Sequence, residues 1–162
     1  MKKSFYFSML IMLSFSLMST TCSNDDDDAN PNDNSQQIAQ VQNTTTSGVW
    51  IITSYVDSGQ DETNDFSGYQ FTFGSDGILT ADNGSNTVTG TWSVTDDSSN
   101  SSDDSNSSSD IDFNIFFPIQ DISVFESLND DWDIVSHTDT TISLIDISGG
   151  NGETDTLVFQ KN

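Results

Sequence analysis

The sequence predicts an all-β fold, an antiparallel up-and-down barrel of eight strands. Three observations lead to this fold class. From residue 47 onward, apolar residues alternate with polar ones along short segments, which is typical of strands with one buried face. Residues that favour tight turns separate these segments at hairpin spacing. The chain has 162 residues, the size of one domain, and eight short strands are enough to close a barrel.

Residues 1–21 have the layout of a signal peptide. Lys2 and Lys3 form a positive start, and an apolar run over residues 5–18 follows them. This run is short for a membrane-spanning helix and has the length of the apolar core of a signal peptide. It ends just before Cys22, the single cysteine of the chain. The segment is therefore predicted to direct export.

The residues around Cys22 resemble the signal of bacterial lipoproteins, in which the cysteine becomes the lipid-bearing first residue of the mature chain. The resemblance implies acylation of Cys22, palmitate included, and attachment to a membrane. Ser19 and Thr21 stand where the family prefers Leu and a small residue. The alternative is an unpaired thiol behind an ordinary cleavage site, which is a liability in an oxidising compartment.

Four aspartates, at residues 25–28, follow the cysteine. By themselves they predict a solvated spacer, because adjacent like charges repel each other. An acidic run in this place is also similar to the export signal of Bacteroidetes lipoproteins. That resemblance implies an outer-membrane protein exposed at the cell surface. Residues 22–46 contain few apolar side chains and are expected to form a disordered acidic tether.

The barrel domain is predicted over residues 47–162. In one of its strands, Phe113 and Ile115 alternate with Asp112 and Asn114, and the other strands follow the same pattern. Hairpin-length turns between the strands favour an up-and-down order. The predicted strands are 48–56, 68–74, 77–82, 86–95, 110–117, 131–137, 140–147 and 154–160.

One long connection, residues 96–110, is composed almost entirely of Ser, Asp and Asn, and we expect it to be mobile. Its carboxylates are ligands of the kind that calcium takes. They lack the spacing of a calcium-binding loop, so we expect weak, diffuse Ca²⁺ binding and no ordered metal site. These aspartates are Asp96, Asp97, Asp103, Asp104 and Asp110.

The other long connection, residues 118–130, carries apolar residues at helical spacing. The pattern predicts either a short amphipathic helix that covers one barrel end or an irregular loop with a few anchors. The apolar residues are Ile119, Ile122, Phe125 and Leu128.

Four motifs over residues 47–161 together resemble the lipocalin-like lipoproteins of flavobacteria. They are Gly48-Val49-Trp50, Gly90-Thr91-Trp92, Asp131-Trp132-Asp133-Ile134 and Leu157-Val158-Phe159-Gln160-Lys161. In lipocalins, the tryptophan of the first motif closes one barrel end and a late basic residue packs over it. The resemblance implies that Gly48, Trp50 and Lys161 form this structural motif here. The alternative is that Lys161 is a frayed terminal residue.

Two functions follow from this resemblance. The first is a barrel that binds a small hydrophobic or amphipathic ligand. Its pocket would be lined by Tyr69, Phe71, Trp92, Phe113 and Ile115. The alternative is that these side chains fill the barrel themselves, since an eight-stranded barrel is small enough for that. The protein would then be a non-catalytic accessory module of the cell surface, which contacts sugars, matrix or another envelope protein.

Charge and composition exclude several other classes. Lys and Arg number 3 against 26 Asp and Glu, a net charge of −23, so a phosphate-backbone or anionic-lipid surface cannot be built. Loss of residues 1–21 would leave 26 acids against Lys161 alone, a net charge of −25. One His and one Cys cannot make the usual four-ligand zinc site. His137, at a strand end, is expected to be a surface residue. We therefore expect no enzyme, no cofactor, no nucleic-acid partner, and a monomer.

Overall fold

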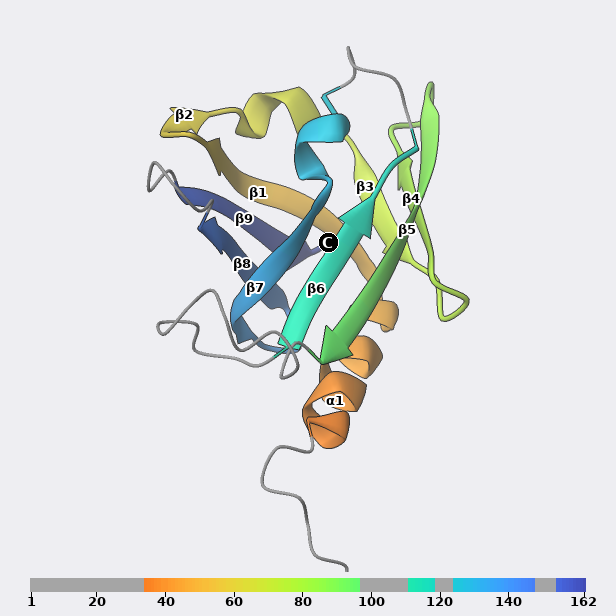
Figure 1. Ribbon diagram of the computed structural model, residues 1–162. Coiled ribbons are helices and arrows are strands. Elements are labelled where there is room, and N and C mark those ends of the chain that lie inside the picture. The colour runs from red at the N-terminus through yellow and green to blue at the C-terminus, as the bar shows by residue number, and fades with distance from the viewer. Residues whose placement is uncertain (1–33, 97–110, 119–123, 148–153) are drawn as a thin grey trace, which may run out of the picture. The chain divides into compact units, whose positions relative to one another are not determined.

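A computed structural model describes residues 34–96, 111–118, 124–147 and 154–162 (Figure 1). Contacts between residues divide the chain into two units, Met1–Asn30 and Pro31–Asn162, and all described residues belong to the second. The signal segment, Cys22 and the aspartates of the predicted calcium loop beyond Asp96 lie outside the described residues. None of the helices in the described part has the length and hydropathy needed to cross a bilayer.

The described strands form one antiparallel sheet that closes on itself. Apart from the two-residue β2, each strand pairs with the next, and β1 pairs with β9 from Trp50↔Lys161 to Val56↔Thr156. Eight strands make the barrel, and the two-residue β2 extends only β1, so the predicted fold class is confirmed. The strands are β1 (Val49–Asp57), β2 (Gln60–Asp61), β3 (Gln70–Phe73), β4 (Ile78–Asp82), β5 (Thr87–Asp96), β6 (Ile111–Phe116), β7 (Asp130–His137), β8 (Thr141–Ile147) and β9 (Thr154–Lys161).

Turn chemistry explains two of the hairpins. Gly77 and Gly84 have φ of +80° and +81°, a backbone region that favours glycine. Asp76 accepts a hydrogen bond from the backbone N–H of Ile78, and Asp82 accepts one from that of Gly84. These aspartates hold the turns by bonding to the backbone two residues further on.

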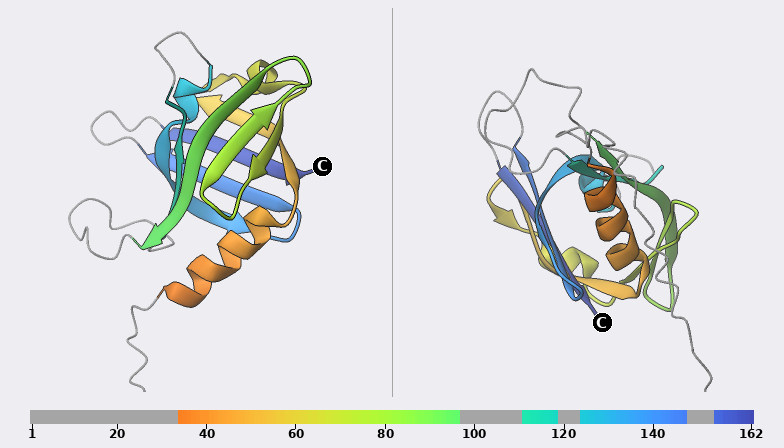
Figure 2. Two further views of the ribbon diagram at one scale, coloured as in Figure 1. Left: turned by 90° about the vertical axis from the view of Figure 1, so that its right-hand side faces the viewer. Right: turned by 90° about the horizontal axis from the view of Figure 1, so that it is seen from below.

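Helix α1 (Ser35–Thr46) corrects the last twelve residues of the predicted tether 22–46, which are helical. Residues 22–33 lie outside the described residues. Val41 and Thr45 are buried, and Ile38 packs against the core. These three residues lie on one face at helical spacing. Figure 2 shows α1 lying across one opening of the barrel. Contact with the barrel therefore stabilises a helix that its polar composition alone does not predict.

The opposite opening carries two short 3₁₀ helices, η1 (Thr63–Phe66) and η2 (Glu126–Leu128). Within the predicted connection 118–130, the structure shows the short helix η2. Two of the predicted anchors are buried: Phe125, just before η2, and Leu128, its last residue. Ile119 and Ile122 lie outside the described residues. We call the opening covered by α1 the helix end, and the opening covered by η1 and η2 the aromatic end.

Candidate functional site

The five residues predicted to line a ligand pocket lie in the barrel interior or at its edge. Phe71, Trp92, Phe113 and Ile115 are buried, and Tyr69 is half-buried. Trp92 and Phe113 stack with ring centroids 5.7 Å apart. The Trp92 indole also donates a hydrogen bond to the Gly74 carbonyl at 2.9 Å. These side chains therefore contact one another and the surrounding backbone.

Two further rings connect these residues across the interior. Phe73 lies 5.3 Å from Trp92 and 5.7 Å from Phe113, between ring centroids. Phe159 lies 5.4 Å from both Phe71 and Phe73. Edge-to-face contacts at these distances are the favoured packing of aromatic rings. A buried aromatic cluster of this kind is compatible with binding of an apolar ligand, but here the rings already pack against each other.

At the helix end, the structure brings together the three residues of the barrel-end motif. Trp50 is fully buried, and its indole N–H donates to the Thr45 carbonyl of α1 at 2.8 Å. The Lys161 Nζ lies 5.1 Å from the centroid of the Trp50 ring and donates to the Ser47 hydroxyl at 2.8 Å. Gly48 leaves room for this lysine, because a Cβ there would lie 2.8 Å from its Cε atom. Lys161 is therefore packed and hydrogen-bonded.

At the aromatic end, one side chain from outside the strands holds several rings together. Phe125 lies 5.0 Å from Tyr69, 5.6 Å from Phe66 and 5.1 Å from Phe117, between ring centroids. The sequence analysis named Phe125 as an anchor, but it missed Phe66 and Phe117. Phe66 stands alone between polar residues in a connection, so no pattern indicates it. Phe117 continues the alternation of Ile111, Phe113 and Ile115, which was the signal that could have found it.

Two polar side chains complete the aromatic end. The Tyr55 hydroxyl donates to the Ser127 carbonyl at 2.7 Å, and the Trp132 indole donates to the Leu128 carbonyl at 3.1 Å. Burial raises the pKa of the Tyr55 phenol, and the carboxylates of Asp57 and Asp155 raise it further. The phenol is therefore protonated at neutral pH and serves as a hydrogen-bond donor.

Asp130 brings a carboxylate to the edge of the aromatic end. Its partial burial raises the pKa of its carboxyl to about 6, and interactions with Asp131 and Asp146 add to this effect. No cation is close by in sequence, because Lys161 is the one cation of residues 22–162 and lies at the helix end. The two ends therefore differ in charge.

Metal-ligating and titratable side chains can be placed in the part of the chain that the structure describes. Within it, no three His, Cys, Asp or Glu side chains are grouped to hold a metal ion. Asp96, at the end of β5, accepts a hydrogen bond from the Asn34 side chain at 3.1 Å. His137 is half-buried at the end of β7, opposite Ile142.

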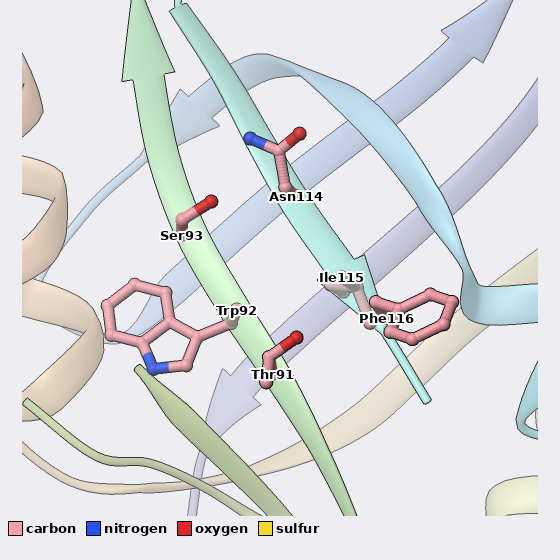
Figure 3. Close-up of a pocket in the computed structure, with 6 residues that line it drawn as sticks. All are labelled: Thr91, Trp92, Ser93, Asn114, Ile115 and Phe116. Carbon is pink, nitrogen blue, oxygen red and sulfur yellow. The ribbon is translucent and has the colours of Figure 1, made fainter. Parts of the chain in front are cut away.

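A shallow pocket of about 200 Å³ lies on the outer face of β5 and β6 (Figure 3). Its lining residues are Thr91, Trp92, Ser93, Asn114, Ile115 and Phe116. Phe116 is 55% exposed, the largest exposure of a large apolar residue in the described part. The sequence analysis missed this pocket. The pair Phe116-Phe117 could have indicated it in the sequence. Successive side chains of an extended chain point to opposite faces, so one of these two rings must face outward.

Comparison with known proteins gives one match. No protein-family model matches the chain, and no curated protein matches it significantly. The crystal structure of a DUF4847 family protein from Bacteroides vulgatus ATCC 8482 is similar, with 17% sequence identity and a TM-score of 0.45. The match covers 75% of this chain and 97% of that chain. We take no functional conclusion from a likeness of this size.

Proposed function

We propose that this chain is a non-catalytic lipoprotein of the outer membrane, anchored by lipid on Cys22, with a lipocalin-like barrel displayed at the cell surface. The interior of the barrel is filled by its own side chains, and the barrel acts as a rigid scaffold. Binding then takes place on its outer surface. One observation carries this proposal above the others: the residues expected to line a pocket are packed against other rings.

The physical argument is the free energy of a filled interior. A ligand that entered between Trp92, Phe113 and Phe159 would have to separate rings that already make favourable contacts. Burying the ligand would return a similar apolar area, so little net free energy is gained. In a preformed carrier pocket, by contrast, the apolar walls face open space before the ligand arrives.

A titration of the purified full chain with a fluorescent fatty acid and with retinol tests the filled interior. We expect no saturable binding of either probe. Val135→Ala, a change at an exposed position of β7, serves as the control for surface adsorption of the probe. Saturable one-to-one binding by the wild-type chain would contradict the filled barrel.

The second candidate is a carrier of a small amphipathic ligand, and the position of Phe125 favours it. This side chain belongs to the connection between β6 and β7 and packs against Phe66 and Tyr69 at the aromatic end, so its movement would uncover both rings. For a carrier, the fatty-acid probe binds to the wild-type chain and the affinity changes in Phe125→Ala. For a filled barrel, the probe binds to neither protein.

The anchor is tested by Cys22→Ala. We expect the wild-type chain to incorporate labelled palmitate and to sediment with outer membranes, and the variant to do neither, because Cys22 is the only cysteine. Labelling and sedimentation that persist in the variant would contradict lipid attachment at this residue. Protease treatment of intact cells then distinguishes surface exposure from an inner-leaflet location.

A further inference from the structure

The outward position of Phe116 is imposed by its neighbours. Phe117, the next residue, is buried in the aromatic end, in space that Gly90 leaves free. A Cβ at Gly90 would lie 2.7 Å from the Phe117 ring. The Asn129 side chain also accepts from the Phe117 backbone N–H and donates to its carbonyl. The backbone is thus held on both sides, and the exposed Phe116 ring is presented from a rigid strand.

Uncharged polar side chains surround this ring on the same face of the sheet. Thr91 pairs with Phe116, and Ser93 pairs with Asn114, so all four side chains project outward from β5 and β6 (Figure 3). The Asn114 amide N–H₂ donates to the Thr95 hydroxyl at 2.9 Å. This bond orients the amide with its nitrogen toward β5 and its oxygen, an acceptor, on the side away from Ser93 (Figure 3). The pocket therefore offers one apolar ring and several hydrogen-bonding groups, of which the Asn114 amide is held in place by Thr95.

Charge narrows the class of ligand. Asp131 lies opposite Asn114 in the neighbouring strand, is exposed, and adds a carboxylate acceptor to the edge of the pocket. The one cation of residues 22–162, Lys161, is engaged with Trp50 and Ser47 at the helix end. A phosphate, sulfate or carboxylate ligand would therefore be repelled. A ligand with many hydroxyl donors and a flat apolar face satisfies both the acceptors and the ring.

We propose that this outer pocket binds a neutral sugar residue of a glycan, with the C–H face of the sugar on the Phe116 ring. The hydroxyls of the sugar donate to Asn114 and Asp131 and exchange hydrogen bonds with Thr91 and Ser93. A pocket of about 200 Å³ holds one sugar ring, and its open shape lets a chain continue on either side. The inference deepens the proposed function, since it names a ligand for the outer surface.

The test is an NMR titration of the ¹⁵N-labelled full chain in a detergent without a sugar headgroup. The probes are maltotriose, cellotriose and the trimer of N-acetylglucosamine, with a sulfated heparin disaccharide as the anionic control. We expect at least one neutral probe to shift the amides of Thr91, Ser93, Asn114 and Phe116, with Kd of the order of 1 mM. We expect no shift with the sulfated sugar.

Three variants locate the site. Phe116→Ala should weaken binding at least tenfold, Phe116→Tyr should retain it because the ring is kept, and Val135→Ala should leave it unchanged. The proposal is overturned if no neutral probe binds at up to ~10 mM, a limit of about 3 kcal/mol, or if Phe116→Ala binds as the wild type does. Equal binding of the sulfated disaccharide would also overturn it. Binding of a fatty acid or retinol reports on the barrel interior. A failure of the filled-barrel proposal can therefore be distinguished from a failure of the sugar-binding proposal.

Discussion

The two ends of this barrel are closed by different kinds of interaction. At the helix end, α1 lies over the opening, and Trp50 and Lys161 are held by hydrogen bonds to Thr45 and Ser47. At the aromatic end, rings gather around Phe125, and the nearby charges are carboxylates. Both ends have a buried indole that donates to a backbone carbonyl. The comparison teaches that the ends differ in what is added to this bond: a cation over Trp50 at the helix end, and a cluster of rings with nearby carboxylates at the aromatic end. Changes at the two ends should therefore differ in size and in their dependence on pH.

The largest expected effect is at the helix end. Trp50→Ala removes a fully buried indole and leaves the Thr45 carbonyl without its donor. We expect the free energy of unfolding to fall by about 3–5 kcal/mol, the usual cost of truncating a large buried aromatic residue. Denaturant unfolding followed by circular dichroism measures this change. Phe116→Ala, at an exposed position, should change stability by less than about 0.5 kcal/mol.

A loss of similar size in Phe116→Ala would mean that the exposed ring supports the barrel, and it would remove the contrast between interior and surface. A small loss in Trp50→Ala would mean that α1 and the helix end contribute little to folding.

The next effect is the pH dependence of the aromatic end. The pKa of the Asp130 carboxyl is raised from an ordinary value of 3.8 to about 6, so its ionisation is less favourable in the folded chain than in the unfolded one. Asp130 therefore favours folding below pH 4, and this contribution is lost as pH rises from 4 to 6. We expect a loss of ~1–2 kcal/mol, which allows for the partial exposure of the carboxyl.

Asp130→Asn tests this assignment, because the amide does not ionise and its oxygen can still accept from the Asp131 backbone N–H. The melting temperature of the wild-type chain should fall between pH 4 and pH 6 by more than that of the variant. Asp61→Asn is the matched control. Hydrogen bonds from Thr63 lower the pKa of the Asp61 carboxyl, so its contribution has the opposite sign. Equal pH dependence in Asp130→Asn and the wild type would assign the effect to other carboxylates.

The strands of both ends could be predicted because their residues alternate, and each predicted boundary lies within about two residues of the structure. The register within the strands is harder to predict. A bulge after Ile52 brings Tyr55 inward, three residues later and against the alternating pattern. Nothing in the period of the sequence indicates such a bulge, since the extra residue is placed by pairing with a distant strand.

The covers of the two ends could be predicted less well, for a physical reason. Helix α1 has only Ile38, Ala39 and Val41 as apolar residues, so its stability comes from the barrel that it contacts. Phe66 at the aromatic end stands alone among polar residues. In both places the local sequence carries no repeating signal, and tertiary packing decides the structure. The motif of Gly48, Trp50 and Lys161 could be identified because its residues match a known pattern at both chain ends of the barrel.

Tyr55→Phe should have a smaller effect on the aromatic end. The change keeps the ring against Phe66 and Trp132 but removes the hydrogen bond to the Ser127 carbonyl. We expect a loss of ~1 kcal/mol in the free energy of unfolding, the usual contribution of one such bond. Chemical denaturation at pH 7 measures it. A variant as stable as the wild type would show that solvent replaces the tyrosine hydroxyl at Ser127.

The smallest effect is expected from Lys161→Met at the helix end. Methionine keeps an unbranched apolar stem beside Gly48, but it lacks the ammonium that lies over the Trp50 ring and donates to Ser47. A cation over an indole contributes about 0.5–1 kcal/mol at a site open to water, and we expect a loss of this size in denaturant unfolding. Lys161→Arg keeps the charge and should retain most of the stability. If Lys161 were a frayed terminal residue, Lys161→Met and Lys161→Arg would both unfold as the wild type does. A loss in Lys161→Met alone therefore assigns the stabilisation to the cation, and it separates this end from the aromatic end, where the charges are negative.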